Sequence, residues 1–385
     1  MRFKFLFFYI IQLSLLCTLH GQTTHDVTLE VNDSLQKKNI LDRIKNYFEE
    51  AKKDKSQKKF DISFIGGPSY SVDTKLGIGI VASGLYRIDK EDHELSPSNV
   101  AIYTNFTTSG FFSIGVENTT IFPQDKYRVY YDMNFAFRPS KYFGIGYQDG
   151  VNDIYTKYDE YRLGLDVNAL KKLWPNVFVG AVFSAQNYDG KHFEVVSLIP
   201  NQRLNTVAVG GGYILSYDSR DFIPNPYKGL YINFQQSFFS EHLGSTNSFN
   251  RVDFTVRTYH KILNKTVLAF DFNGNFTNGD VPWNLLPQLG GSRQMRGYFQ
   301  GQYRDRKQLN SQIEIRQKIY NRHGVVFWGG AGNVFDDFKV YKWKQTLPNY
   351  GFGYRWEFKN RVNIRFDYGI GKGQSGFYFN INESF

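Results

Sequence analysis

The chain has 385 residues, a formal net charge of +10 and an aromatic content of 18%. Its negative mean hydropathy excludes a bundle of membrane-spanning helices. The single cysteine excludes an internal disulfide framework and a cysteine metal site.

The first element in chain order is a predicted secretory signal peptide over residues 1–21. Arg2 and Lys4 form a basic start, Phe5 to Leu16 form the apolar segment, and Gly21 offers a cleavage point. Residues 22–59 are polar and rich in lysine and glutamate. A short apolar stripe within them predicts an amphipathic helix or a disordered tether, and we expect mainly a solvated periplasmic linker.

From residue 60 onward the sequence alternates with period two, as in "RVYYDMNFAFR" and "VNIRFDYGI". Each such stretch has one apolar, aromatic-rich face and one polar or ionic face. A soluble β-sandwich would also alternate. Repeated strands at short spacing and faces rich in Phe and Tyr favour an all-β transmembrane antiparallel barrel of about 16 strands. The predicted barrel domain covers residues 60–385.

We predict strands from residue 75 to the end of the chain. Short turns such as "RPSK" and "LNK" are expected to be periplasmic, and longer connections such as "KEDHELSPS" and "VSLIPNQRLN" extracellular. The predicted strands are 75–87, 98–108, 109–121, 126–138, 140–148, 154–169, 175–190, 204–218, 228–239, 248–262, 264–278, 307–318, 323–334, 346–357, 362–370 and 375–385.

The long basic segment "GGSRQMRGYFQGQYRDR" lies between the eleventh and twelfth predicted strands. It resembles the loop-six signature of the BamA/TamA outer-membrane insertase superfamily, also called the bacterial surface antigen family. Three further motifs support the resemblance: a D-x-R-D-x4-P-x2-G turn, a first-strand entry in "PSYSVDTKLGIG", and an aromatic terminal assembly signal. The residues that carry the loop, turn and terminal motifs are Gly290, Gly291, Arg296, Gly297 and Tyr298; Asp218, Arg220, Asp221, Pro226 and Gly229; and Phe377, Phe379, Ile381 and Phe385.

The resemblance implies that this loop folds back into the barrel lumen and that Arg296 docks on the inner wall. Alternation places Glu314 on the lumen face, so it is the expected docking partner, and an arginine fork on a shielded carboxylate is strong. The sequence departs from the family at Gly330, where an aspartate that also engages the arginine is usual. Arg296 is then expected to depend more on Glu314, or on another lumen acid such as Asp367.

A second departure is that residues 22–59 are too short for a periplasmic POTRA domain, so the resemblance implies a short member without one. The implied function is assembly, insertion or translocation of outer-membrane proteins through a seam between the first strand, 75–87, and the last, 375–385. The alternative is a passive channel or structural surface antigen. Expected partners are outer-membrane lipid and glycolipid, unfolded outer-membrane proteins and a periplasmic accessory protein, with no nucleic acid. The sequence contains no catalytic motif and predicts no metal site or cofactor, so we expect no enzyme activity.

Overall fold

The computed structural model describes residues 60–71, 73–89, 95, 97–381 and 383–385. The chain divides into two units, Met1–Tyr47 and Phe48–Phe385. The predicted signal peptide, 1–21, and the predicted linker, 22–59, lie outside the described residues. The second unit contains the whole sheet.

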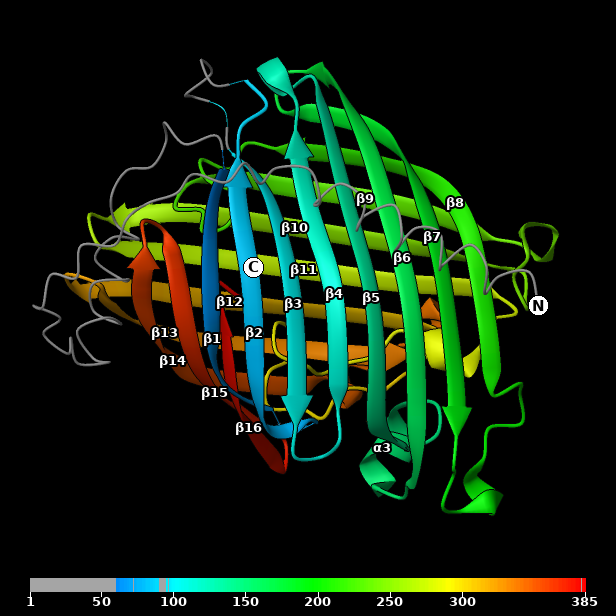
Figure 1. Cartoon of the computed structure of the whole chain (residues 1–385). Coiled ribbons are helices and arrows are strands. Elements are labelled where there is room, and N and C mark those ends of the chain that lie inside the picture. The colour runs from blue at the N-terminus through cyan, green and yellow to red at the C-terminus, as the bar shows by residue number, and fades with distance from the viewer. Residues whose placement is uncertain (1–59, 72, 90–94, 96, 382) are drawn as a thin grey trace, which may run out of the picture. The chain divides into compact units, whose positions relative to one another are not determined.

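Sixteen antiparallel strands form one sheet, and each strand is hydrogen-bonded to its neighbours in sequence order. The sheet curves into a nearly closed barrel, in which strands β3–β7 cross in front of β10–β13 (Figure 1). The strands are β1 (Phe60–Ser71), β2 (Lys75–Tyr86), β3 (Ser98–Thr107), β4 (Phe112–Ile121), β5 (Tyr127–Tyr142), β6 (Thr156–Trp174), β7 (Val177–Lys191), β8 (Asn205–Asp218), β9 (Gly229–Phe239), β10 (Phe249–Leu263), β11 (Thr266–Gly279), β12 (Lys307–Tyr320), β13 (His323–Phe335), β14 (Leu347–Lys359), β15 (Val362–Gly371) and β16 (Gln374–Ile381).

Short helices lie in the connections between strands. They are η1 (Pro123–Asp125), α3 (Tyr147–Asn152), η2 (Val196–Leu198), η3 (Glu241–Leu243), η4 (Trp283–Leu285), η5 (Phe338–Val340) and η6 (Trp343–Gln345). Among the described residues, no helix is long and apolar enough to cross a membrane.

The predicted alternation is visible in β12. Ile313 and Ile315 are each 47% exposed on the outer surface, whereas Gln312 and Glu314 between them are buried inside the barrel. An apolar outer face and a polar inner face are typical of an outer-membrane barrel. The buried polar side chains therefore belong to the lumen.

The connections lie at two rims, which we name from the topology. The N-terminal rim is where β1 begins and where even-numbered strands end, and the loop rim is the opposite end. The turn between β10 and β11 and the connection between β2 and β3 both follow even-numbered strands, so both lie at the N-terminal rim. The prediction that "KEDHELSPS" (90–98) is extracellular while "LNK" is periplasmic is therefore wrong, because connection length does not track the rim here.

The predicted number of strands, about 16, agrees with the structure, but only because two errors cancel: one strand was missed and another was predicted as two. β1 (Phe60–Ser71) was not predicted, and "PSYSVDTKLGIG" forms the β1–β2 hairpin rather than the entry to the first strand. The predicted strands 126–138 and 140–148 are mostly one strand, β5, which continues through "RPSK" as far as Tyr142. Pro139 pairs with Asp159 of β6 but lies beyond the last residue that pairs with β4, so its missing N–H costs no ladder bond on that side.

The last strand is shorter than predicted. β16 ends at Ile381 rather than at residue 385. Phe385, predicted to share the outer face of Phe377, is instead buried against Tyr259 and Ala269. The alternation of the sequence continues to its end, but residues 383–385 do not continue the strand.

Candidate functional site

The connection between β11 and β12, residues 280–306, is the long predicted loop, and it packs against inward-facing residues of the wall. Leu289, Met295 and Tyr298 of the loop form one buried cluster with Val334 of β13 and Leu347 of β14. This apolar contact holds the middle of a strongly basic segment in place. The loop is therefore an internal element of the barrel.

Glycines allow the sharp turns of this loop. Gly290, Gly291 and Gly297 have φ values of 102°, 115° and 110°, a region that side chains with a Cβ rarely adopt. Close approach matters as much, because a Cβ on Gly297 would lie 2.8 Å from the backbone nitrogen of Gly371 in β15. The Arg-Gly-Tyr sequence thus lets the loop backbone lie directly against the wall.

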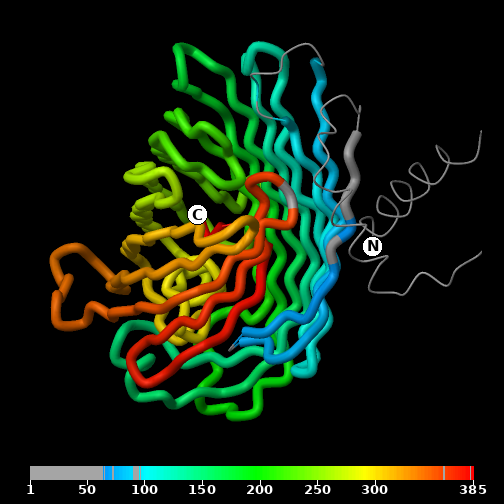
Figure 2. Tube along the Cα trace, turned by 90° about the vertical axis from the view of Figure 1, so that its left-hand side faces the viewer, coloured from blue at the N-terminus to red at the C-terminus, as the bar shows by residue number. Residues whose placement is uncertain are grey.

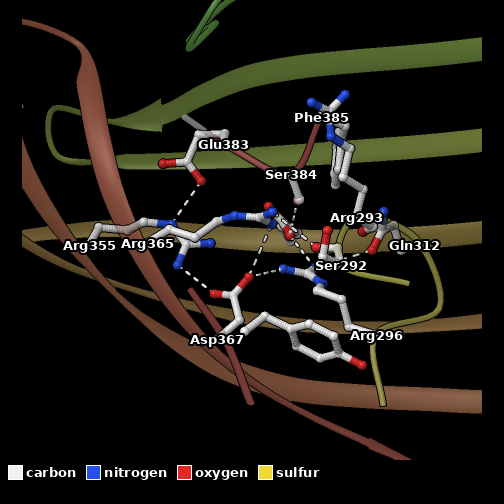
Figure 3. Close-up of polar contacts among 12 residues, drawn as sticks. Ser292, Arg293, Arg296, Gln312, Arg355, Arg365, Asp367, Glu383, Ser384 and Phe385 are labelled. Carbon is white, nitrogen blue, oxygen red and sulfur yellow. Dashed lines mark hydrogen bonds and ion pairs between the residues drawn. The ribbon is translucent and has the colours of Figure 1, made fainter. Parts of the chain in front are cut away.

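Arg296 is fully buried and contacts acids from two strands. Its guanidinium donates hydrogen bonds to Glu314 of β12 and to Asp367 of β15, the latter at 2.6 Å (Figure 3). It donates a third bond to Gln312 at 3.2 Å and stacks on Trp328 of β13, with Cζ 3.6 Å from the ring centroid. The structure therefore brings Arg296 to Glu314, the contact that the resemblance implies.

Arg296 is part of a larger buried network, which we call the arginine cluster. Its members are Arg296, Glu314, Arg316, Arg355, Arg365, Asp367 and Glu383.

Asp367 is the centre of the arginine cluster. Its carboxylate accepts from Arg296 and Arg355, each at 2.6 Å, and from Arg365 at 3.2 Å. Four arginines face three side-chain carboxylates in the cluster, and Arg316 also contacts the main-chain oxygen of Phe385. A buried ionic network is stable only when each charge keeps a partner, so Asp367 is the member whose loss strips the most partners.

Gly330 explains why Asp367 takes this position. Gly330 of β13 pairs with Gln312 on one side and Asn349 on the other. A Cβ at Gly330 would lie 2.5 Å from the carbonyl oxygen of Ser311. No side chain is accommodated there, and the second carboxylate for Arg296 comes from β15 instead.

The end of the loop also contacts both edges of the sheet. The N–H of Gly297 donates to the hydroxyl of Tyr378 in β16 at 2.8 Å. The N–H of Gln300 donates to Asp73, in the turn between β1 and β2, at 2.7 Å. Burial raises the pKa of Asp73 to about 6. One loop therefore contacts the first hairpin and the last strand together.

The two edge strands β1 and β16 lie side by side without a ladder between them. Figure 2 shows the blue N-terminal strands next to the red C-terminal ones. The rings of Tyr70 and Phe377 are 6.5 Å apart, and a Cβ on Gly67 would lie 3.1 Å from the ring of Phe379. Within the described part of the chain, β1 pairs only with β2, and β16 only with β15. We call this contact the seam; it is formed by β1, not by the predicted first strand, 75–87.

The D-x-R-D turn motif orders the β8–β9 connection at the N-terminal rim. Asp218 accepts from Arg220 and from Arg128 of β5, each at 2.8 Å. The side chain of Asp221 accepts from the backbone N–H of Tyr227 at 2.9 Å. The last two motif residues complete the turn, with Pro226 buried and Gly229 at a φ of 115°.

Residues 383–385, which we call the tail, join the arginine cluster from the chain's end. Glu383 accepts from Arg355 at 2.8 Å, and Ser384 donates to Glu314 at 2.7 Å. Arg316 donates to the main-chain oxygen of Phe385 at 2.9 Å. Of the predicted terminal signal, Phe377, Phe379 and Ile381 remain on β16, and Phe385 is separated from them in the lumen.

Sequence reasoning named Arg296, Glu314 and Asp367 but missed Trp328, Arg355 and the tail. Trp328 had a detectable signal, because it pairs with Glu314 across β12 and β13 and so falls on the polar face. An aromatic side chain at a lumen position beside the docking carboxylate indicates a platform for a guanidinium. Among the described residues, no group of His, Cys, Asp and Glu is placed to bind a metal ion.

The barrel, its apolar outer face and its polar lumen define the class of outer-membrane β-barrels. Residues 97–385 match the Omp85 superfamily domain, and the chain belongs to the Omp85 superfamily. Its location is accordingly the outer membrane of a Gram-negative bacterium.

Solved structures are similar in fold. BamA from Haemophilus ducreyi lacking POTRA domains 1–3 has a TM-score of 0.55 and 13% identity, covering 84% of this chain and 70% of that one. CdiB from Acinetobacter baumannii has a TM-score of 0.55 and 12% identity, covering 85% of this chain and 60% of that one. The present chain thus spans less than two thirds of that CdiB chain. No match was found among curated proteins.

Proposed function

We propose that this barrel assists the insertion or translocation of outer-membrane proteins, and that the seam between β1 and β16 is where it acts. The observation that carries the proposal is the pair of neighbouring edge strands without a hydrogen-bonded ladder. An unpaired edge presents free N–H and C=O groups to an incoming strand. In lipid such groups are costly to leave unpaired, so a client strand gains by pairing there.

The loop supports this role by a separate argument. It contacts the β1–β2 turn through Asp73 and β16 through Tyr378, so it holds the two edges at a fixed distance without joining them. A barrel whose wall opens at one place needs such an internal support. The arginine cluster fixes the loop to the strands on the β16 side, which leaves β1 as the more weakly held edge.

The test is the folding rate of an unfolded client barrel into liposomes that contain this protein. We use a Cys17→Ser background and introduce Gly67→Cys with Phe379→Cys, which joins β1 to β16 when cross-linked. Ala185→Cys with Val209→Cys is the matched control, because these residues pair within the β7–β8 ladder. We expect a several-fold acceleration that is lost on cross-linking the seam and retained in the control.

Two results would contradict the proposal. Equal acceleration with the seam open and closed would remove the seam from the mechanism. No acceleration at all would favour the alternative of a passive channel or structural barrel, and steady single-channel conductance in planar bilayers would then support a channel.

A further inference from the structure

We infer that the connection between β13 and β14, residues 336–346, anchors the barrel to negatively charged lipid headgroups at the loop rim. This surface is separate from the seam, so the inference does not depend on the proposed function. The connection contains η5 and η6, and its contacts place it against the outer face of β11, β12 and β13.

The connection covers a lysine that faces outward. Lys307 precedes Ile313 on β12 by an even number of positions, so its side chain leaves the same outer face. Nevertheless Lys307 is only 5% exposed, whereas Ile313 is 47% exposed. The Nζ of Lys307 donates to the main-chain oxygen of Asp336 at 2.7 Å and to the carboxylate of Asp337 at 3.3 Å. The start of the connection is thus fixed on the outside of the wall.

Two further contacts hold the connection on the outer face. Phe276 of β11 and Phe335 of β13 both pair with the covered lysine, so they share its outward direction. Their rings contact the ring of Phe338, with centroids 5.3 Å and 5.2 Å apart. Asn333 of β13 donates to the main-chain oxygen of Lys342 at 3.1 Å. The connection is therefore an ordered part of the outer surface.

The connection lies at the upper edge of the apolar band. Val325 is the first apolar residue of β13 that faces outward, and Phe335 faces outward near the other end of the strand. The ten residues between these positions, on a strand tilted by about 40°, rise about 25 Å along the barrel axis, which is about the height of the apolar band. Phe327, between them, is 57% exposed, as a lipid-facing side chain should be. The connection therefore lies where the acyl chains end and the headgroups begin.

Exposed apolar and cationic side chains follow one another along the connection. Phe338, Val340 and Trp343 are 56%, 52% and 80% exposed. The acids of this segment, Asp336 and Asp337, pair with Arg306 and Lys307, which precede it in the chain. The segment's own exposed lysines are therefore an excess of positive charge; they are Lys339, Lys342 and Lys344.

This combination matches the membrane interface. Aromatic rings are favoured at the level of the headgroups. A neighbouring lysine can lay its apolar stem along the acyl boundary while its ammonium group reaches a lipid phosphate. Exposed lysines alone would suit any anion. Here they lie beside large apolar side chains on an ordered surface that continues the lipid-facing wall, and this combination selects a lipid.

The experiment measures quenching of Trp343 emission by brominated lipid, with the full chain in phosphatidylcholine nanodiscs. A fixed minor share of the lipid is brominated near the headgroup and is either phosphatidylglycerol, which is anionic, or phosphatidylcholine, which is zwitterionic. The Trp343→Phe variant, measured in parallel, gives the emission of the other tryptophans for subtraction. We expect both lipids to quench Trp343, and the anionic lipid to do so about fivefold more effectively.

Two triple variants that remove the same charge test the lysines. The test variant should lose the preference for the anionic lipid; it combines Lys339→Gln, Lys342→Gln and Lys344→Gln. The control should keep the preference; it changes three exposed lysines near the opposite rim, Lys171→Gln, Lys261→Gln and Lys265→Gln. Heat-modifiable gel migration checks that both variants are folded.

Quenching of Trp343 by aqueous acrylamide, with none by brominated lipid, would overturn the proposal, because the connection would then face water or a soluble partner. Equal quenching by the two lipids in the unmodified chain would also overturn it, because the lysines would then select no anionic headgroup. A loss of preference in the control as large as that in the test variant would have the same consequence, because the overall charge of the protein would be its cause.

Discussion

Replacing Asp367 should destabilise the barrel more than replacing Arg296, although Arg296 carries the family motif. Asp367→Asn removes the negative charge, and one of the two acceptor oxygens, that three buried guanidiniums share at 2.6–3.2 Å. Four arginines then face two carboxylates. Arg296→Ala leaves three arginines and three side-chain carboxylates. Both acids that Arg296 contacts keep another arginine partner: Glu314 keeps Arg316 at 3.0 Å, and Asp367 keeps Arg355 at 2.6 Å.

Breaking a buried ion pair costs about 3–5 kcal/mol when a charge is left uncompensated. We therefore expect Asp367→Asn to lower the free energy of unfolding by about 5 kcal/mol, the upper end of that range. Arg296→Ala should lower it by about 3 kcal/mol, the lower end. The double variant restores the native difference between the numbers of arginines and of side-chain carboxylates in the cluster, so its cost should be less than the sum of the two single costs.

The measurement is the free energy of unfolding from urea titration in detergent micelles, with heat-modifiable gel migration as a second readout. Arg306→Ala is the control within the same loop, because its ion pair with Asp336 is exposed and worth about 1 kcal/mol or less. If Arg296→Ala is the more damaging change, or if the two costs simply add, the charge-balance reasoning is refuted.

The remaining predictions concern the loop contacts. Gly297→Ala should lower the free energy of unfolding by about 2 kcal/mol or more and expose the loop to protease. Gly373→Ala is the control: Gly373 has a φ of 73° but open space around its Cα, so the change should cost only about 1 kcal/mol. Equal costs would exclude the close approach of the backbones as the cause. Asp73 has a folded-state pKa of about 6 against 3.8, so the folded protein binds more protons between these values and gains stability as the pH falls through this window. Asp73→Asn should therefore raise the melting temperature near neutral pH. It should add about 1 kcal/mol to the free energy of unfolding, after allowance for partial exposure, and flatten the dependence of stability on pH. An unchanged pH dependence would show that another group titrates there.

The alternation of side chains carries most of the fold prediction, and its errors have local causes. β1 was missed because Gly66, Gly67 and Pro68 interrupt its alternation of apolar and polar residues. Such residues argue against a strand in the middle of a sheet. At the edge of the sheet β1 needs only one neighbour, and that neighbour is β2. An edge strand tolerates such residues because it is paired on one side only, so their presence did not exclude a strand here.

The sequence predicted the site only as far as the alternation of side chains assigns residues to the lumen face. Parity places Glu314 and Asp367 in the lumen, but it does not reveal that Asp367 collects three arginines from the loop, β14 and β15. That arrangement depends on barrel closure, which brings together residues about 70 positions apart, as in the Arg296–Asp367 pair with a separation of 71. The tail was misplaced for the same reason, since its partners lie on β12 and β14.

The tail has a consequence for the order in which the barrel forms. Glu383 and Ser384 follow the last strand, β16, and both bond to members of the arginine cluster. Docking of the loop is therefore complete only after the final hairpin has reached its place. Such long-range contacts form late, because they require most of the chain to be ordered first. The arginine cluster is therefore complete only in a barrel that already contains its last strands.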